Sequence, residues 1–278
     1  MNLSATNSVL SISVVIPVYS GEKSLPILIE ELSFLANETN VTPKGIYFSI
    51  KEVILVHDCG PDQSDLVLED LSIKYSFIRV IWLTRNFGQH AATLAGMANA
   101  VGNWIVTMDE DGQQNPLEIS KMLDIALSKN FQIVYAQPLN QPPHGFFRNF
   151  FSNLAKKLAI YFLGGKYQLG VFNSFRLIDG EVARILAAYS GYGIYLDVAL
   201  FWIASQIGYA PVLMRKEYRP SSYSFGMLFN HFWRMVLTSG TRPLRIITII
   251  GGLSSLLALC LMGYALYSKL IDSNPIQG

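Results

Sequence analysis

The chain contains few cysteines, few charged residues and no marked charge imbalance. Of its 278 residues two are cysteine and 15% are charged, and 21 basic side chains nearly balance 20 acidic ones. Cys59 and Cys260 therefore indicate neither a disulfide framework nor a zinc site. A net charge of +1 argues against a dedicated nucleic-acid binder. The N-terminus shows no secretory signal, because its first residues carry no positive charge and the apolar run after them is short.

Charge is missing altogether from one long stretch near the C-terminus. Residues 246–268 read IITIIGGLSSLLALCLMGYALYS. At about 1.5 Å per residue a helix of this length reaches roughly 34 Å, enough to cross a hydrocarbon core about 30 Å thick. A buried core helix is the alternative, but such helices seldom run this far without a polar face. Arg242 and Arg245 precede the stretch, so we expect a transmembrane helix with the N-terminal region in the cytoplasm.

Short apolar runs alternate with helical patterns through the first 136 residues. Strands are expected at residues 11–18, 50–56, 78–83, 104–108 and 133–136. The helices between them are expected to end near residues 37, 75, 100 and 128. This alternation predicts an α/β fold with a mainly parallel sheet and helices on both faces. In such sheets ligands bind beyond the carboxyl ends of the strands.

The pattern changes after residue 137. Residues 146–163 (FFRNFFSNLAKKLAIYFL) combine cations with aromatic and leucine side chains, which is typical of a helix lying on a membrane surface. A helix packed on the sheet is the alternative. Residues 225–237 form a second amphipathic candidate that leads almost directly into the apolar stretch.

Two carboxylates, Asp109 and Asp111, follow the fourth expected strand. Strand geometry sends residues i and i+2 to the same side, so the two can converge on one point. Two negative charges placed this close together repel each other, which raises the free energy unless a cation lies between them. A divalent cation with oxygen ligands meets that need and leaves positions for phosphate oxygens. The alternative is a solvated acidic turn.

Polar side chains also follow the first two expected strands. Asp58 ends the second, where a carboxylate can accept hydrogen bonds from a nucleotide base or ribose. A helix-capping or Asx-turn role is its alternative. Pro17, Tyr19 and Glu22 lie at the end of the first strand, at the same expected edge of the sheet.

Four segments resemble the family 2 glycosyltransferases. They are IPVYSGEKSL, VHDCGPDQS, LTRNFGQHAATLAGMANAVGNWIVTMDEDGQQNP and PLRIITIIGG. More narrowly, they are similar to the polyprenyl-phosphate glycosyltransferases, which include the dolichyl-phosphate mannose synthases, bactoprenol glucosyltransferases and undecaprenyl-phosphate aminoarabinose transferases. The resemblance covers residues 11–278 and is most specific between RNFGQHAAT and MDEDGQQNP. Many relatives carry a second membrane helix, which would begin about where this sequence ends.

The resemblance implies a glycosyltransferase A fold, an inverting mechanism and a bound Mg²⁺ or Mn²⁺. It assigns the metal to Asp109, Asp111 and Gln113. It assigns the nucleotide-sugar donor to Pro17, Tyr19, Glu22, Asp58, Asp109, Glu110 and Asp111. It assigns the phosphate of the lipid acceptor to Arg148, Ser152, Arg219 and Ser222. The catalytic roles fall to Asp109, Asp111, Arg148 and Arg219.

The same resemblance implies partners and a domain order. The expected partners are a UDP- or GDP-linked sugar, a polyprenyl phosphate and the inner membrane, with the catalytic domain on the cytoplasmic side; a homo-oligomer stays open. The expected units are a donor-binding half at 1–145, an acceptor-side half at 146–224, a juxtamembrane helix at 225–245, a transmembrane helix at 246–268 and a tail at 269–278.

Three departures from the family pattern leave the class intact but leave the sugar open. His57 stands where an aspartate is usual, Gln137 replaces an arginine, and a glycine is missing between Arg219 and the Ser-x-Tyr segment. Two other functions therefore stay open. One is transfer to the hydroxyl of a lipid-linked saccharide, for which Asp197 would be the candidate base, although a helix or acceptor-loop role is favoured for this residue. The other is an inactive, membrane-tethered transferase-like subunit.

A phosphate acceptor is favoured over a hydroxyl on chemical grounds. A phosphate monoester is already largely dianionic at neutral pH, because its second pKa is near 6, so it needs no general base. A sugar hydroxyl does need one, and processive synthases pair that base with a Gln-x-x-Arg-Trp motif, which this sequence lacks.

Overall fold

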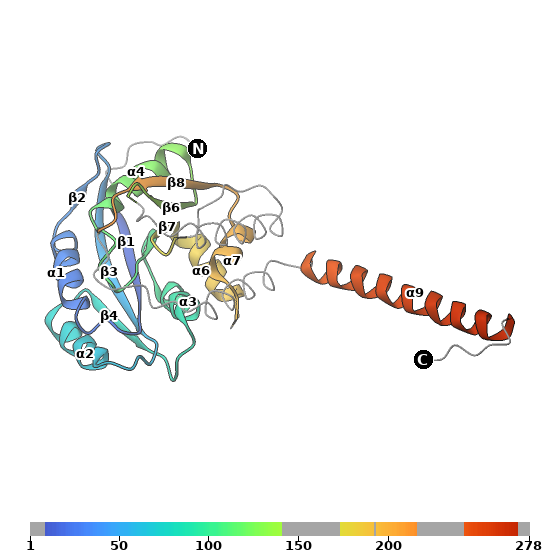
Figure 1. Cartoon of the computed structure of the whole chain (residues 1–278). Helices are drawn as coiled ribbons and strands as arrows, with labels where there is room; N and C mark the ends of the chain where they lie inside the picture. Colours follow the sequence, from blue (N-terminus) through green and yellow to red (C-terminus); the bar gives the residue numbers. More distant parts are fainter. Residues whose placement is uncertain (1–8, 141–172, 192, 216–241, 272–278) are drawn as a thin grey trace.

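The computed structural model describes residues 9–140, 173–191, 193–215 and 242–271. The expected surface helices at 146–163 and 225–237 lie outside these ranges, as do Arg148, Ser152, Arg219 and Ser222. The described part is an α/β body from which one long helix extends (Figure 1).

The five strands expected from the sequence are all present. They are β1 (Leu10–Val18), β3 (Tyr47–His57), β4 (Ile78–Trp82), β5 (Trp104–Thr107) and β6 (Ile133–Pro138). The helices between them are α1 (Leu25–Ala36), α2 (Ser64–Lys74), α3 (Gln89–Asn99) and α4 (Glu118–Lys129). Both sets agree with the expected boundaries to within a few residues, because apolar β-branched runs and helical periodicity alternate clearly here.

Three further strands complete one eight-stranded sheet. They are β2 (Asn40–Val41), β7 (Arg176–Asp179) and β8 (Ile207–Val212), and the order is β2-β3-β1-β5-β7-β6-β8, with β4 also on β3. Strands β4, β3, β1 and β5 are parallel to one another, and β6 is parallel to β8. Strand β7 is antiparallel to both β5 and β6 and joins the two groups. Strand β2 is also antiparallel to β3, so the sheet as a whole is mixed, and the expected parallel arrangement holds for the five strands predicted from the sequence within each of the two groups.

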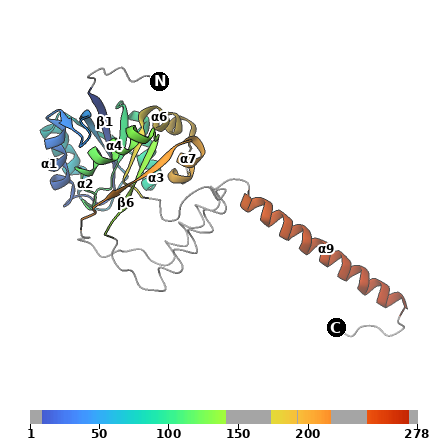
Figure 2. The ribbon, with the colours of Figure 1, turned by 90° about the horizontal axis from the view of Figure 1, so that it is seen from above.

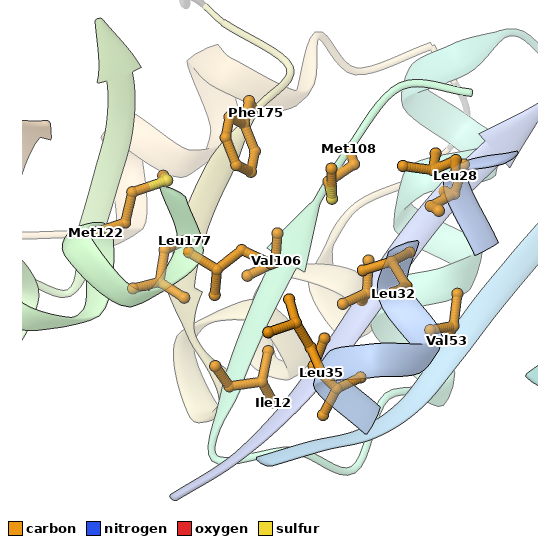
Figure 3. Close-up of a cluster of buried hydrophobic side chains, with 14 of the residues drawn as sticks. Ile12, Leu28, Leu32, Leu35, Val53, Val106, Met108, Met122, Phe175 and Leu177 are labelled. Carbon is orange, nitrogen blue, oxygen red and sulfur yellow. The ribbon is translucent and has the colours of Figure 1, made fainter. Parts of the chain in front are cut away.

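Helices cover both faces of the sheet, as expected. Along β5 the side chain of Val106 joins the core under α1 and α4, whereas that of Ile105 joins the core under α3, α6 (Gly180–Tyr189) and α7 (Leu196–Ile203). This alternation is the two-residue period of a strand buried on both faces. Figure 3 shows part of the first core, which includes Ile12 of β1, Leu32 of α1 and Met122 of α4.

A close approach brings α3 onto β1. A Cβ atom on Gly96 would lie 2.3 Å from the Cγ1 atom of Val15, so only glycine allows this helix to lie so near the sheet. The approach matters for the site, because it fixes where the first residue of α3, Gln89, is placed.

The long helix α9 spans Arg242–Ile271 and contains the apolar stretch expected to cross a membrane. Within it, Ile247–Ile271 has a mean hydropathy of 2.0 and is unburied by the rest of the described chain. Figure 2 shows α9 projecting away from the sheet and its helices. By length and composition it can cross a membrane.

Candidate active site

Asp109 lies just beyond the carboxyl end of β5 and is held by three side chains from three parts of the fold. Gln89, at the start of α3, donates to Asp109 Oδ1 over 2.6 Å. Gln114 Nε2 donates to Asp109 Oδ2 over 2.9 Å, and the Ser174 hydroxyl hydrogen-bonds the same oxygen. The orientation of this carboxylate is therefore set by the surrounding protein.

Asp111 is close enough to influence Asp109 electrostatically. Burial raises the pKa of Asp109 to about 6; the Ser174 hydrogen bond opposes this rise and the negative charge of Asp111 adds to it. Asp111 itself is exposed, and its Oδ1 accepts from the Gln113 backbone N–H over 3.0 Å. A cation between the two carboxylates would relieve both the burial cost and the repulsion.

The donor set at this edge fits a hard divalent cation. No group of three His, Cys, Asp or Glu side chains that could hold a metal occurs within the described ranges. Two carboxylates are nonetheless a common protein contribution to a Mg²⁺ site, because Mg²⁺ keeps several waters and takes phosphate oxygens from its substrate. The expected ligand Gln113 lies next to Asp111, and its role toward a metal stays a prediction.

Glu110 connects the end of β5 to the end of β1. Its two carboxylate oxygens accept from the backbone N–H groups of Tyr19 and Ser20, each over 2.8 Å. These contacts show that Glu110 fixes the loop after β1, and its assignment to the donor stays a prediction. Tyr19 on that loop is 47% exposed.

Asp58 directly follows β3, as expected, and its carboxylate accepts hydrogen bonds from backbone N–H groups. It is buried and accepts from the N–H groups of Phe87 and Gly88 over 2.7 and 2.8 Å. Gly88 precedes α3 and has a φ of +88°, so Asp58 fixes the turn that starts this helix. Asp58 thus has a structural role at the start of the distant helix α3, which differs from the local turn or cap named as the alternative, and contact with a nucleotide stays a prediction.

The loops after β1 and β3 lie against each other. A Cβ atom on Gly60 would fall 1.5 Å from the carbonyl oxygen of Tyr19, so only glycine fits at this position. Asp62 Oδ2 accepts from the Glu22 backbone N–H over 3.1 Å. The expected donor residues Pro17, Tyr19, Glu22 and Asp58 are therefore brought to one edge of the sheet together with Asp109.

Asp197 lies in the first turn of α7, within a buried ion pair. Its Oδ1 accepts from the Tyr135 hydroxyl over 3.0 Å and lies 3.3 Å from Arg176 Nη2. Burial raises the pKa of Asp197, and the charge of Arg176 opposes that rise. Its side chain is only 4% exposed, so within the described structure it faces the interior.

Four residues of this site were not anticipated: Gln89, Gln114, Ser174 and Arg176. Gln89 and Gln114 lie inside the segment in which the resemblance is most specific, and that position was the available signal. No sequence signal pointed to Ser174 or Arg176, because β7 is four residues long and its pairing depends on distant strands.

Comparison with known proteins gives the same assignment along most of the chain. The family model described as Glycosyl transferase family 2 matches residues 13–179. The undecaprenyl-phosphate 4-deoxy-4-formamido-L-arabinose transferase of Pectobacterium atrosepticum is 30% identical over 266 residues, which cover 92% of this chain and 77% of that protein. Its namesake from Klebsiella pneumoniae is 28% identical over 248 residues, which cover 88% of this chain and 72% of that protein.

Solved structures share the fold at lower sequence identity. Mycobacterium tuberculosis glucosyl-3-phosphoglycerate synthase, with Mn²⁺, UDP-glucose and phosphoglyceric acid, is 17% identical with a TM-score of 0.57, covering 83% of this chain and 79% of that one. S. aureus TarS with UDP-GlcNAc is 16% identical with a TM-score of 0.54, covering 84% and 67%. The chain belongs to glycosyltransferase family 2 and has a glycosyltransferase A fold.

Proposed function

We propose that this enzyme transfers a sugar from a UDP-linked donor to undecaprenyl phosphate, with inversion and with a divalent metal. The relatives named as undecaprenyl-phosphate transferases support the acceptor, because the similarity extends over nine-tenths of this chain. The solved structures that hold UDP-sugars support UDP as the nucleotide.

The observation that carries the choice of acceptor is the burial of Asp197. A hydroxyl acceptor needs a general base within hydrogen-bond reach of the reacting proton. Asp197, the candidate base, instead forms an ion pair with Arg176 and accepts a hydrogen bond from Tyr135. Its side chain is buried within the described structure. A phosphate dianion needs no base, so these contacts favour a lipid phosphate.

The donor side of the mechanism is assigned to the strand ends. Asp109 and Asp111 would hold Mg²⁺ or Mn²⁺, which would neutralise the departing diphosphate. Gln89, Gln114 and Ser174 hold Asp109 in place for that task. A phosphate oxygen of the acceptor forms the new bond to the anomeric carbon while the bond from that carbon to the UDP oxygen breaks, and UDP leaves.

The acceptor side is assigned to the second half of the chain. Arg148, Ser152, Arg219 and Ser222 would bind the lipid phosphate, for which a guanidinium suits the geometry. Helix α9 would anchor the enzyme in the inner membrane with the sheet on the cytoplasmic side. This arrangement would present the lipid headgroup to a donor bound at the strand ends.

The test is transfer of label into lipid. Membranes containing the enzyme are incubated with radiolabelled UDP-sugars, undecaprenyl phosphate and Mg²⁺ or Mn²⁺. We expect a chloroform-extractable product that mild acid hydrolyses, and we expect it to disappear with Asp111→Asn. Absence of lipid label from every donor would refute the proposal, and label in a lipid-linked saccharide instead would point to a hydroxyl acceptor.

A further inference from the structure

We propose that Arg176 is a positioning residue that couples α7 to the metal-binding carboxylate Asp109. The inference rests on the metal site of the proposed function and names a residue outside that site on which its geometry depends. Arg176 is 4% exposed, lies on β7, and is paired in register with Thr107 of β5 and Tyr135 of β6.

The guanidinium of Arg176 contacts both the backbone before β7 and the first turn of α7. Nε donates to the carbonyl oxygen of Asn173 over 2.9 Å, and Nη2 lies 3.3 Å from Asp197 Oδ1. Nη1 is buried and has no hydrogen-bond partner among the residues that the structure describes. One side chain thus holds both the backbone before β7 and the first turn of α7.

The backbone before β7 leads directly to Asp109. Ser174 follows Asn173, and its carbonyl oxygen accepts from the Thr107 hydroxyl over 2.6 Å. Its own hydroxyl hydrogen-bonds Asp109 and accepts from Gln114 Nε2 over 2.9 Å. Arg176 and Thr107 therefore hold the peptide carbonyls on either side of the Cα atom of Ser174, and so fix where its hydroxyl meets Asp109.

A second route links α7 to the other oxygen of Asp109. Tyr195, the residue before α7, packs against His90 in a tilted arrangement, with ring centroids 4.3 Å apart and ring planes 50° apart. His90 follows Gln89, which donates to Asp109 Oδ1 over 2.6 Å. The beginning of α7 is thereby connected to both carboxylate oxygens, through β7 on one side and through α3 on the other.

Arg176 acts on Asp109 through its charge as well as through Ser174. Its positive charge opposes the rise in the pKa of Asp109, so loss of Arg176 removes both a hydrogen-bond anchor for the backbone before β7 and a charge that favours the ionised carboxylate. Loss of residues that orient metal ligands typically weakens metal binding about 10- to 100-fold. A pair that served stability alone would lower the melting temperature and leave metal affinity unchanged.

The experiment measures Mn²⁺ affinity by electron paramagnetic resonance on the full chain in detergent, in the presence of UDP. We expect Arg176→Met to weaken Mn²⁺ binding about tenfold, and Arg176→Lys to recover part of that loss because it keeps the charge. Tyr135→Phe, which removes one hydrogen bond to Asp197, should weaken binding by a smaller factor. UDP affinity measured without metal should stay at its wild-type value in all three.

The matched control is Arg79→Met. Arg79 also pairs with a buried carboxylate, Glu52, over 2.7 Å, but at the amino ends of the strands, away from Asp109. This variant should lose stability and keep wild-type Mn²⁺ affinity.

Two results would overturn the inference in distinguishable ways. Wild-type Mn²⁺ affinity in Arg176→Lys and Tyr135→Phe, together with wild-type affinity in Arg176→Met where that variant folds, would remove Arg176 from the metal site. Absence of any Mn²⁺ binding that depends on Asp109 in the wild-type enzyme would remove the metal site itself, and the coupling with it.

Discussion

Gln114 forms two hydrogen bonds with Asp109: its Nε2 donates to the carboxylate over 2.9 Å, and its Oε1 accepts from the Asp109 backbone N–H over 2.9 Å. The side chain of Gln114 is buried, and its amide also reaches Ser174. The family resemblance directed attention to the neighbouring Gln113 as a residue near the metal. The structure adds a second glutamine, Gln114, which holds the carboxylate of Asp109 in place.

The two glutamines should respond differently to truncation. Gln114→Ala removes three hydrogen bonds and leaves buried polar groups unpaired, which we expect to lower the free energy of unfolding by about 1–3 kcal/mol and to reduce transfer activity strongly. Gln113→Ala should change the free energy of unfolding by less than about 0.5 kcal/mol. Denaturant unfolding of both variants measures the difference, and equal destabilisation would contradict it.

Asp58→Asn should loosen the turn that starts α3. An amide offers one acceptor oxygen where the carboxylate offers two, so one of the N–H groups of Phe87 and Gly88 loses its partner. We expect a loss of about 1–3 kcal/mol in the free energy of unfolding and a higher KM for the nucleotide sugar. Asp65→Asn, at an exposed position in the first turn of α2, is the control and should cost less than about 1 kcal/mol. An unchanged KM in Asp58→Asn would separate this turn from donor binding.

The stability of the metal-free enzyme should depend on pH through the titration of Asp109. Burial raises the pKa of this group from 3.8 to about 6, so between these values the folded state binds a proton that the unfolded state releases. The contribution of Asp109 to stability is therefore present at low pH and is lost as pH rises through about 6.

Asp109→Asn removes this titration. In the presence of a chelator, its melting temperature relative to wild type should rise between about pH 4 and pH 7. Adding Mn²⁺ at neutral pH should stabilise the wild-type enzyme and leave the variant unchanged, because ligand binding to the folded state adds to its stability. A difference in melting temperature that is independent of pH would contradict the raised pKa of Asp109.

Gly60→Ala should separate the loops after β1 and β3. The new Cβ atom would lie 1.5 Å from the Tyr19 carbonyl oxygen, a distance that forces the backbone to move. We expect a large loss of stability and impaired donor binding, measured by thermal unfolding and by UDP titration. Gly191→Ala is the control, because a Cβ atom there meets nothing within 4 Å. Wild-type UDP affinity in Gly60→Ala would show that the contact between these loops is dispensable for the donor.

The sequence by itself determined the elements that depend on local pattern. Apart from the two-residue strand β2, the strands and helices up to residue 138 follow from apolar runs and helical periodicity, and the membrane-length helix follows from a charge-free stretch. The position of Asp109 after β5 also follows, because a carboxylate directly after a buried strand must emerge at the edge of the sheet.

Tertiary structure alone decided which side chains hold that carboxylate. Strand β7 is short, and its antiparallel place between β5 and β6 depends on pairing with distant residues. That pairing brings Ser174 to Asp109 across 65 positions of sequence, and Arg176 to Asp197 beneath it. No local propensity encodes such contacts, since they form only when the buried polar groups of separate elements must satisfy one another.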